Sequence, residues 1–270
     1  MIQGLAGALV LVCCVAALYE PPARPDPGLL KNEEPVHERD PARAVIYQGR
    51  GIQFVKDGKL EFALDQFHRA AEYDPLNISI LINIAYVLDK LGRYDQAIAD
   101  LKDAEKIDPR NSTIYLNWGN SLINMKKFEE AIEPLQKAVD LDPSNQLAYV
   151  NLGAAFNNLG RYKEAAGKFE KAIELDPKNV PLIFNLATIW SNLGETNKAL
   201  QEYGHVIELA PTSLAAYYNC AAIYEKQGRL DEAIEKMRAA IKIDPDNATL
   251  REILSRLLAA KVKRMPDTKP

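Results

Sequence analysis

Cysteine and histidine are scarce in this sequence of 270 residues, and their scarcity narrows the chemistry that the chain can support. Three residues of each type are present. Cys13 and Cys14 lie in an apolar N-terminal run, so Cys220 alone remains beyond it and cannot form a disulfide there. No histidine has a Cys, His or carboxylate at the spacing of a metal site. We therefore expect no disulfide within the folded part, no metal and no cofactor.

A concentrated basic surface and a glycine-rich loop are also missing. Lysine and arginine total 33 against 37 aspartate and glutamate, which gives a net charge of −4 and no reason to expect nucleic acid. Glycines occur singly, so no loop can cradle a phosphate. No nucleophile and base can be assembled either, and we expect a protein that is not an enzyme and has no small-molecule substrate.

A strict period of 34 residues organises most of the chain. The stretch from Gln146 to Asn179 reads as two amphipathic helices, broken at Gly160 and stopped at Pro177. Prolines recur at Pro75, Pro109, Pro143, Pro177, Pro211 and Pro245. One column of small residues holds Ala63, Ala97, Ala131, Ala165, Ala199 and Ala233, and a second holds Gly51, Ala85, Gly119, Gly153, Ala187 and Ala221. Small residues let two helices approach closely. The glycine between the two helices recurs in every repeat except the third, which has Lys126.

The spacing of Tyr149, Leu152, Gly153 and Phe156, followed by alanine, phenylalanine and the closing proline, resembles the tetratricopeptide repeat. The resemblance implies an all-α fold, a right-handed α-solenoid of six helix-turn-helix repeats. The repeats are expected at residues 44–77, 78–111, 112–145, 146–179, 180–213 and 214–247. Residues 248–263 have one apolar stripe and one polar side, which predicts a helix that caps the stack, and 264–270 form a flexible tail.

The N-terminal segments differ in composition from the repeats. Residues 2–18 are apolar and uncharged, so 1–18 are predicted to be either a membrane anchor or a cleaved signal peptide, with lipidation of Cys13 or Cys14 as a third alternative. Residues 19–43 are rich in proline and charge, which predicts a linker that holds the repeats away from a membrane. Asp40 is expected to cap the first helix. Each of these alternatives predicts a membrane-anchored or exported protein, on the periplasmic or extracytoplasmic side, or a secreted one.

Asparagine occupies two columns of the repeat. The column just before each first helix suits N-capping, and it holds Asn77, Asn111, Asn145, Asn179 and Asn247. The other column lies inside the first helices, where asparagine is unfavourable because its amide competes for backbone hydrogen bonds. This second column holds Asn83, Asn117, Asn151, Asn185 and Asn219, and the same helix face also carries Asn120, Asn124, Asn158 and Asn192.

The column inside the first helices resembles the asparagine ladder of some tetratricopeptide arrays, where first helices line a concave groove and the amides grip an extended peptide. An amide suits that task because it offers both a donor and an acceptor to any peptide group. Tyr86 and Lys90 are expected to add contacts in the groove. The alternative is that these amides bond to neighbouring helices or to water.

We therefore expect a protein-interaction scaffold that binds an extended peptide segment of a partner protein and is tethered through its N-terminal segment. Two narrower alternatives are a lipoprotein similar to those that assist type IV pilus or secretin assembly, and a non-catalytic targeting subunit for a separate glycosyltransferase. A structural spacer that self-associates through its convex face is a further alternative.

Overall fold

Helices account for the secondary structure of the chain wherever the structure, a computed structural model, describes it, namely over residues 39–264. The six first helices are α1 (Pro41–Lys56), α3 (Ile78–Lys90), α5 (Ser112–Asn124), α7 (Gln146–Asn158), α9 (Val180–Asn192) and α11 (Leu214–Lys226). The six second helices are α2 (Leu60–Tyr73), α4 (Tyr94–Ile107), α6 (Phe128–Leu141), α8 (Tyr162–Leu175), α10 (Thr196–Leu209) and α12 (Leu230–Ile243), and α13 (Ala248–Arg264) follows them.

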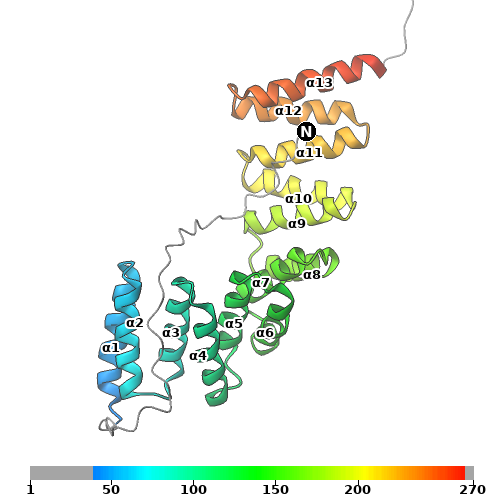
Figure 1. Cartoon of the computed structure of the whole chain (residues 1–270). Coiled ribbons are helices and arrows are strands. Elements are labelled where there is room, and N and C mark those ends of the chain that lie inside the picture. The colour runs from blue at the N-terminus through cyan, green and yellow to red at the C-terminus, as the bar shows by residue number, and fades with distance from the viewer. Residues whose placement is uncertain (1–38, 265–270) are drawn as a thin grey trace, which may run out of the picture. The chain divides into compact units, whose positions relative to one another are not determined.

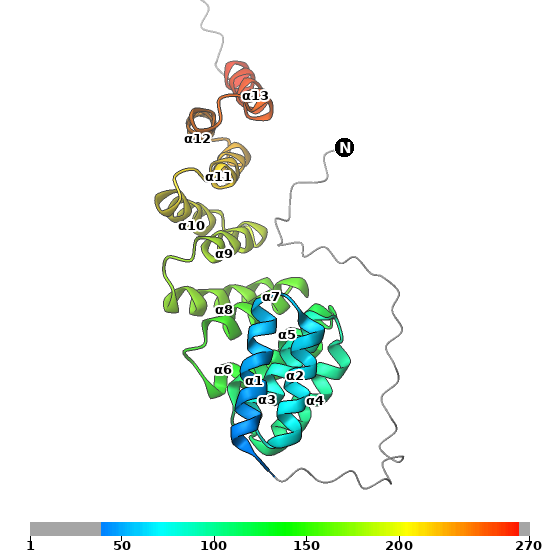
Figure 2. The same cartoon turned by 90° about the vertical axis from the view of Figure 1, so that its left-hand side faces the viewer.

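The helices stack in chain order (Figure 1). Each first helix packs against the second helix of its own repeat, and that second helix packs against the first helix of the next repeat. A second view shows the same succession (Figure 2). The expectation of an all-α solenoid with six helix pairs is confirmed. The expected capping helix is also present, because α13 packs on α12 with Leu250 and Leu257 buried.

The turn inside each repeat depends on one residue with a positive φ. Gly58, Gly92, Gly160, Gly194 and Gly228 have φ between 71° and 78°. A glycine adopts this left-handed conformation without a steric penalty, so the predicted break between the two helices is confirmed. The third repeat makes the same turn with Lys126, whose φ is 61°.

The turn between repeats is held by side chains that satisfy exposed backbone groups. The carboxylates of Asp108 and Asp142 each accept from the backbone N–H two residues later, at 3.0 and 3.1 Å. Four of the five predicted asparagine caps accept from the first turn of the helix that follows, and they are Asn111, Asn145, Asn179 and Asn247. The fifth, Asn77, instead donates its amide to Asp74 at 3.0 Å.

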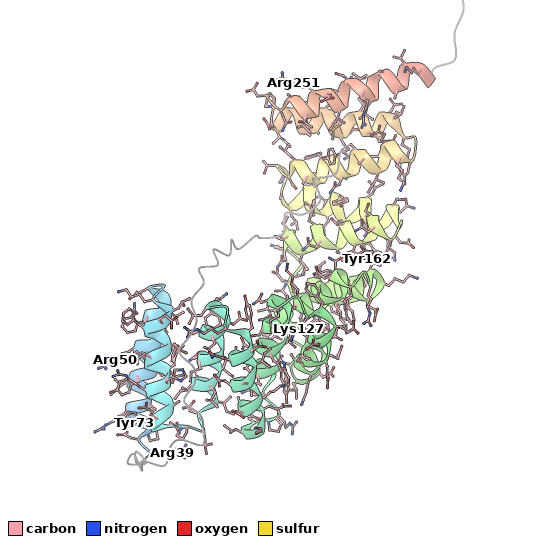
Figure 3. The ribbon with its side chains drawn as sticks, in the orientation of Figure 1. Arg39, Arg50, Tyr73, Lys127, Tyr162 and Arg251 are labelled. Carbon is pink, nitrogen blue, oxygen red and sulfur yellow. The ribbon has the colours of Figure 1, made fainter. Side chains whose placement is uncertain are left out.

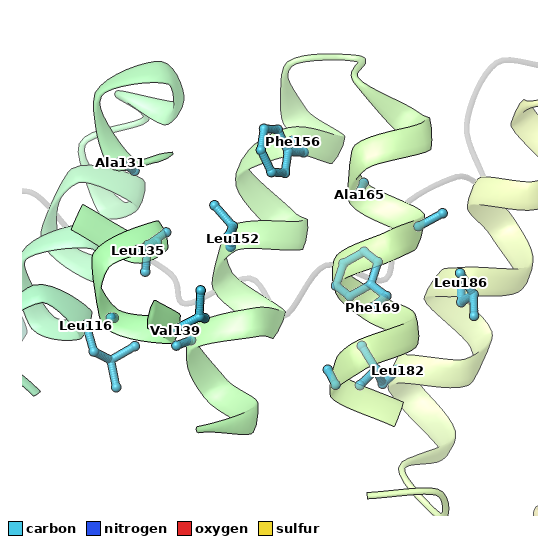
Figure 4. Close-up of a cluster of buried hydrophobic side chains, with 14 of the residues drawn as sticks. Leu116, Ala131, Leu135, Val139, Leu152, Phe156, Ala165, Phe169, Leu182 and Leu186 are labelled. Carbon is cyan, nitrogen blue, oxygen red and sulfur yellow. The ribbon is translucent and has the colours of Figure 1, made fainter. Parts of the chain in front are cut away.

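The core runs through the interfaces between helices, where the small-residue columns lie. All six alanines of the first column are fully buried. At Gly119 an added Cβ would lie 2.4 Å from Leu135 Cγ, and at Gly153 it would lie 3.0 Å from the Phe169 ring. Figure 4 shows Leu135 and Phe169 in the central cluster, which extends from α5 to α9. Small residues therefore set the spacing between the two helices of a repeat, as the sequence predicts.

The first helix begins earlier than the predicted end of the linker. Helix α1 begins at Pro41 with Asp40 accepting from the backbone N–H of Arg43, so the predicted linker, 19–43, extends three residues too far. Arg39 and Tyr73 lie at the same end of the α1–α2 pair (Figure 3), where Asp40 N–H donates to the Tyr73 carbonyl. The predicted leader, 1–18, residues 19–38 of the predicted linker and the tail beyond Arg264 lie outside the described residues. Among the residues described, no helix is long and apolar enough to cross a membrane.

Candidate functional site

The asparagine column lies on the first helices, and we call the surface that these asparagines and the exposed residues of the first helices form the first-helix face. Helix α5 contacts both α3 and α7 directly, so this surface is continuous over the second, third and fourth repeats. Side chains also bridge neighbouring repeats, since the Asn151 amide of α7 donates to the Asn120 carbonyl oxygen of α5. The structure therefore brings the central part of the predicted site together.

Several amides of this face donate to the protein itself. Asn117 donates to the carbonyl oxygen of Thr113 at 2.9 Å, and Asn158 donates to that of Ala154 at 2.8 Å, in each case one turn back in the same helix. Asn124 donates to both carboxylate oxygens of Asp89, at 3.1 and 3.0 Å. The alternative of bonding within the protein thus applies to part of the site.

These internal bonds use the amide nitrogen and leave the Oδ1 acceptor of each asparagine available. Asn117, Asn124, Asn151 and Asn158 all use a side-chain N–H, and within residues 39–264 none of their Oδ1 atoms accepts a hydrogen bond from the protein. An amide has two N–H donors and one acceptor oxygen, so each of these residues keeps an acceptor for an incoming N–H. The internal bond also fixes the rotamer, which lowers the entropy cost of using that acceptor.

Three further residues of the predicted site make no hydrogen bond inside the described part of the chain. They are Asn83, Asn185 and Asn192. Asn185 and Asn192 are exposed on α9, whereas Asn83 on α3 is half-buried. Their amides present both donors and the acceptor.

The sixth repeat departs from the pattern. Asn219 lies beside the hydroxyl of Tyr203, which is 2% exposed and occupies the position of Phe169 in the fourth repeat. Thr188 Oγ1 lies 3.0 Å from the same hydroxyl and donates to the Phe184 carbonyl. Burial raises the pKa of Tyr203. Asn219 therefore has this buried hydroxyl as its neighbour, unlike the other asparagines of the column.

Tyr86 and Lys90 lie together on α3. The Lys90 ammonium nitrogen is 5.5 Å from the centre of the Tyr86 ring, and Tyr86 is 41% exposed. The adjacent carboxylate of Asp89 accepts from the Ser121 hydroxyl at 2.9 Å as well as from Asn124. Asp89 is therefore engaged by α5, while Lys90 remains a cation on the surface.

Each asparagine of the column directly follows an apolar residue, a repetition that sequence reasoning missed. Most of these apolar residues pack against the core, and among them Tyr218 is the exposed one. The apolar residues are Ile82, Leu116, Val150, Phe184 and Tyr218. Leu116 is buried and Tyr218 is 45% exposed. Ile82, Val150 and Phe184 are half-buried. Leu147, 51% exposed, adds to the apolar surface of α7.

The described metal-ligating side chains and the Cys220 thiol form no further site. Over the described residues, no three His, Cys, Asp or Glu side chains are placed to hold a metal ion. Cys220 is 2% exposed, and burial raises its pKa to about 11, so its thiol stays protonated at neutral pH.

Comparison with protein families gives three tetratricopeptide repeat profiles, which match residues 116–180, 158–222 and 214–247. The profile of the anaphase-promoting complex, cyclosome, subunit 3 matches residues 58–138. Comparison with curated protein sequences gives no significant match.

Solved structures with the same fold are numerous. YrrB, described as a tetratricopeptide repeat protein with an unusual peptide-binding site, is 26% identical with a TM-score of 0.61, covering 72% of this chain and 97% of YrrB. MamA is 26% identical with a TM-score of 0.58, covering 72% of this chain and 98% of MamA. PilF of Pseudomonas aeruginosa is 20% identical with a TM-score of 0.63, covering 80% and 98%. At that identity the likeness to PilF concerns the fold alone.

The repeated helix pairs, the columns of small residues and the matching profiles agree with one another. The chain belongs to the tetratricopeptide repeat family and is a scaffold for protein interaction.

Proposed function

We propose that the chain binds an extended segment of a partner protein along the first-helix face. The observation that carries this proposal is the set of amides on α5 and α7 whose N–H groups are held internally while their Oδ1 acceptors stay unused by the protein. Acceptors that recur at the same position of successive repeats suit the recurring N–H donors of an extended backbone.

Two further features support peptide binding. The exposed apolar residues Leu147 and Tyr218 of the first helices offer contacts for side chains of the bound segment, so that its backbone and some of its side chains are recognised together. YrrB, a structural relative at 26% identity, is described as having an unusual peptide-binding site.

The test uses the full chain and a displayed library of random linear peptides, followed by fluorescence polarisation with the selected peptides. Asn117→Ala combined with Asn151→Ala removes two amides. Because each hydrogen bond contributes about 0.5–1.5 kcal/mol, we expect binding to weaken by roughly 5- to 150-fold. Asn197→Ala is the matched control, since Asn197 is an exposed asparagine on the second helix α10. Peptides that bind both variants equally would place the contact elsewhere, for example on the second helices.

We also propose that residues 1–18 place the repeats at a membrane or direct them out of the cytoplasm. The apolar, uncharged composition of residues 2–18 supports this. Carbonate extraction of cells combined with mass spectrometry of the mature N-terminus separates the alternatives. A retained leader in the membrane pellet indicates an anchor, a shortened soluble chain indicates a cleaved signal, and a lipid on Cys13 or Cys14 favours the assembly-lipoprotein alternative. A full-length chain recovered in the soluble fraction would contradict the proposal.

A further inference from the structure

The helices of the first-helix face contribute no charged residue in three consecutive repeats. Helices α5, α7 and α9 each have thirteen residues, and none of these is Asp, Glu, Lys, Arg or His. Their partners α6, α8 and α10 carry both acidic and basic residues. In a chain with 26% charged residues, this difference separates one surface from the rest.

Burial does not account for the absence, because the exposed residues of these helices are uncharged too. They include Asn124, Leu147, Asn158, Asn185 and Asn192. At an exposed helical position, lysine or glutamate favours the helix more than asparagine does and improves solubility. The composition of this face therefore works against helix stability, and helix formation alone does not explain it.

Charge returns to the first helices only outside this region. The C-terminal ends of α3 and α11 carry Asp89 with Lys90, and Glu225 with Lys226. Glu225 accepts from Arg256 at 2.8 Å, and Asp89 is engaged by Ser121 and Asn124. Neither Lys90 nor Lys226 forms an ion pair with a described residue. The uncharged region is thus bounded by two available cations.

We propose that the partner segment is uncharged where it faces α5, α7 and α9, and that acidic residues are accepted only where it passes Lys90 or Lys226. This rests on the proposed function and specifies its ligand. A charged side chain pressed against these helices would lose water and meet no opposite charge from α5, α7 or α9 themselves, whereas amide, hydroxyl and apolar side chains would meet matching groups. The occupant is therefore an extended, neutral stretch of protein.

The experiment uses the full chain and the peptides selected from the random linear library. Each position of a selected peptide is replaced in turn by Asp, by Lys and by Asn. We expect Asp or Lys at central positions to weaken binding at least tenfold, Asn to be tolerated, and Asp at the ends to be accepted. Asn185→Asp in the protein should restore binding of a peptide with a central Lys by at least fivefold. Asn197→Asp makes the same change on α10, as the matched control, and should restore nothing.

Two outcomes would overturn the inference. Selected peptides with central charges as frequent as in the unselected library would show that the face binds peptides without excluding charge, and the proposed function would survive if Asn117→Ala with Asn151→Ala still weakened them. Peptides insensitive to that double variant, or no selected peptide at all, would refute the proposed function and this inference with it.

Discussion

Lys126 is the one non-glycine residue with a positive φ in the part of the chain that the structure describes, and Lys126→Gly should stabilise the protein. The left-handed conformation costs a residue with a Cβ about 1–2 kcal/mol, and at 61° Lys126 lies in that region. Glycine would offset part of the gain, because its freedom in the unfolded chain costs about 0.5–1 kcal/mol. The net effect on the free energy of unfolding is therefore a gain of about 0.5–1 kcal/mol, or roughly 1–4 °C in melting temperature for a domain of this size.

The reverse substitution in the next repeat provides the matched comparison. Gly160 has a φ of 72°, and nothing lies within 4 Å of a Cβ added there, so the penalty of Gly160→Lys comes from the backbone alone. We expect it to destabilise the chain by a similar amount. Urea unfolding followed by circular dichroism at 222 nm measures both changes. The reasoning is refuted if Lys126→Gly lowers the stability, or if Gly160→Lys leaves it unchanged.

Substitutions at Gly119, Gly167 and Asn77 test the packing, the helix propensity and the turn between repeats. Gly119→Ala should destabilise the chain by about 1–3 kcal/mol in urea unfolding, because its Cβ would overlap Leu135; an unchanged midpoint would mean that α5 and α6 separate easily. Gly167→Ala should stabilise by about 0.5–1 kcal/mol in the same assay, since Gly167 is an exposed helical residue with open space around it, and a loss would contradict the prediction. The Asn77 amide, the largest single cause, and the Arg39 guanidinium lower the pKa of Asp74. Their contribution to the free energy of unfolding is therefore present at neutral pH, and it is lost as the pH falls through the folded pKa of Asp74, below about pH 4. Asn77→Ala should thus lower stability at pH 7 and not at pH 2, and an equal loss at both values would exclude the carboxylate.

The repeat architecture could be predicted from the sequence because its determinants recur at fixed positions. The turn glycine and the capping asparagine act on neighbours within one or two turns, and the small residues act on the partner helix of the same repeat. Because each repeat has the same requirements, the same residue types recur every 34 residues in the sequence. Even the exception, Lys126, keeps the conformation of the glycines because the flanking helices require it.

The detailed state of the asparagine column could not be predicted in this way. Asn117 turns to its own helix, Asn151 to the preceding repeat, and Asn219 to Tyr203. The residue type is the same, but the nearest available partner differs, and that depends on residues outside the column such as a tyrosine in place of phenylalanine. Periodicity locates the amides, whereas the hydrogen bond that each one makes depends on its own surroundings.

The stacking of the helices has a consequence for what a ligand can do to this protein. Each helix pair contacts only the pairs before and after it in the chain. One repeat can therefore stabilise a distant repeat only through the repeats that lie between them. A segment held by α5, α7 and α9 at once would join three units by a second route that does not follow the polypeptide. Occupancy would then make the middle of the array melt as one block, and the protection of its amide hydrogens from exchange would rise together.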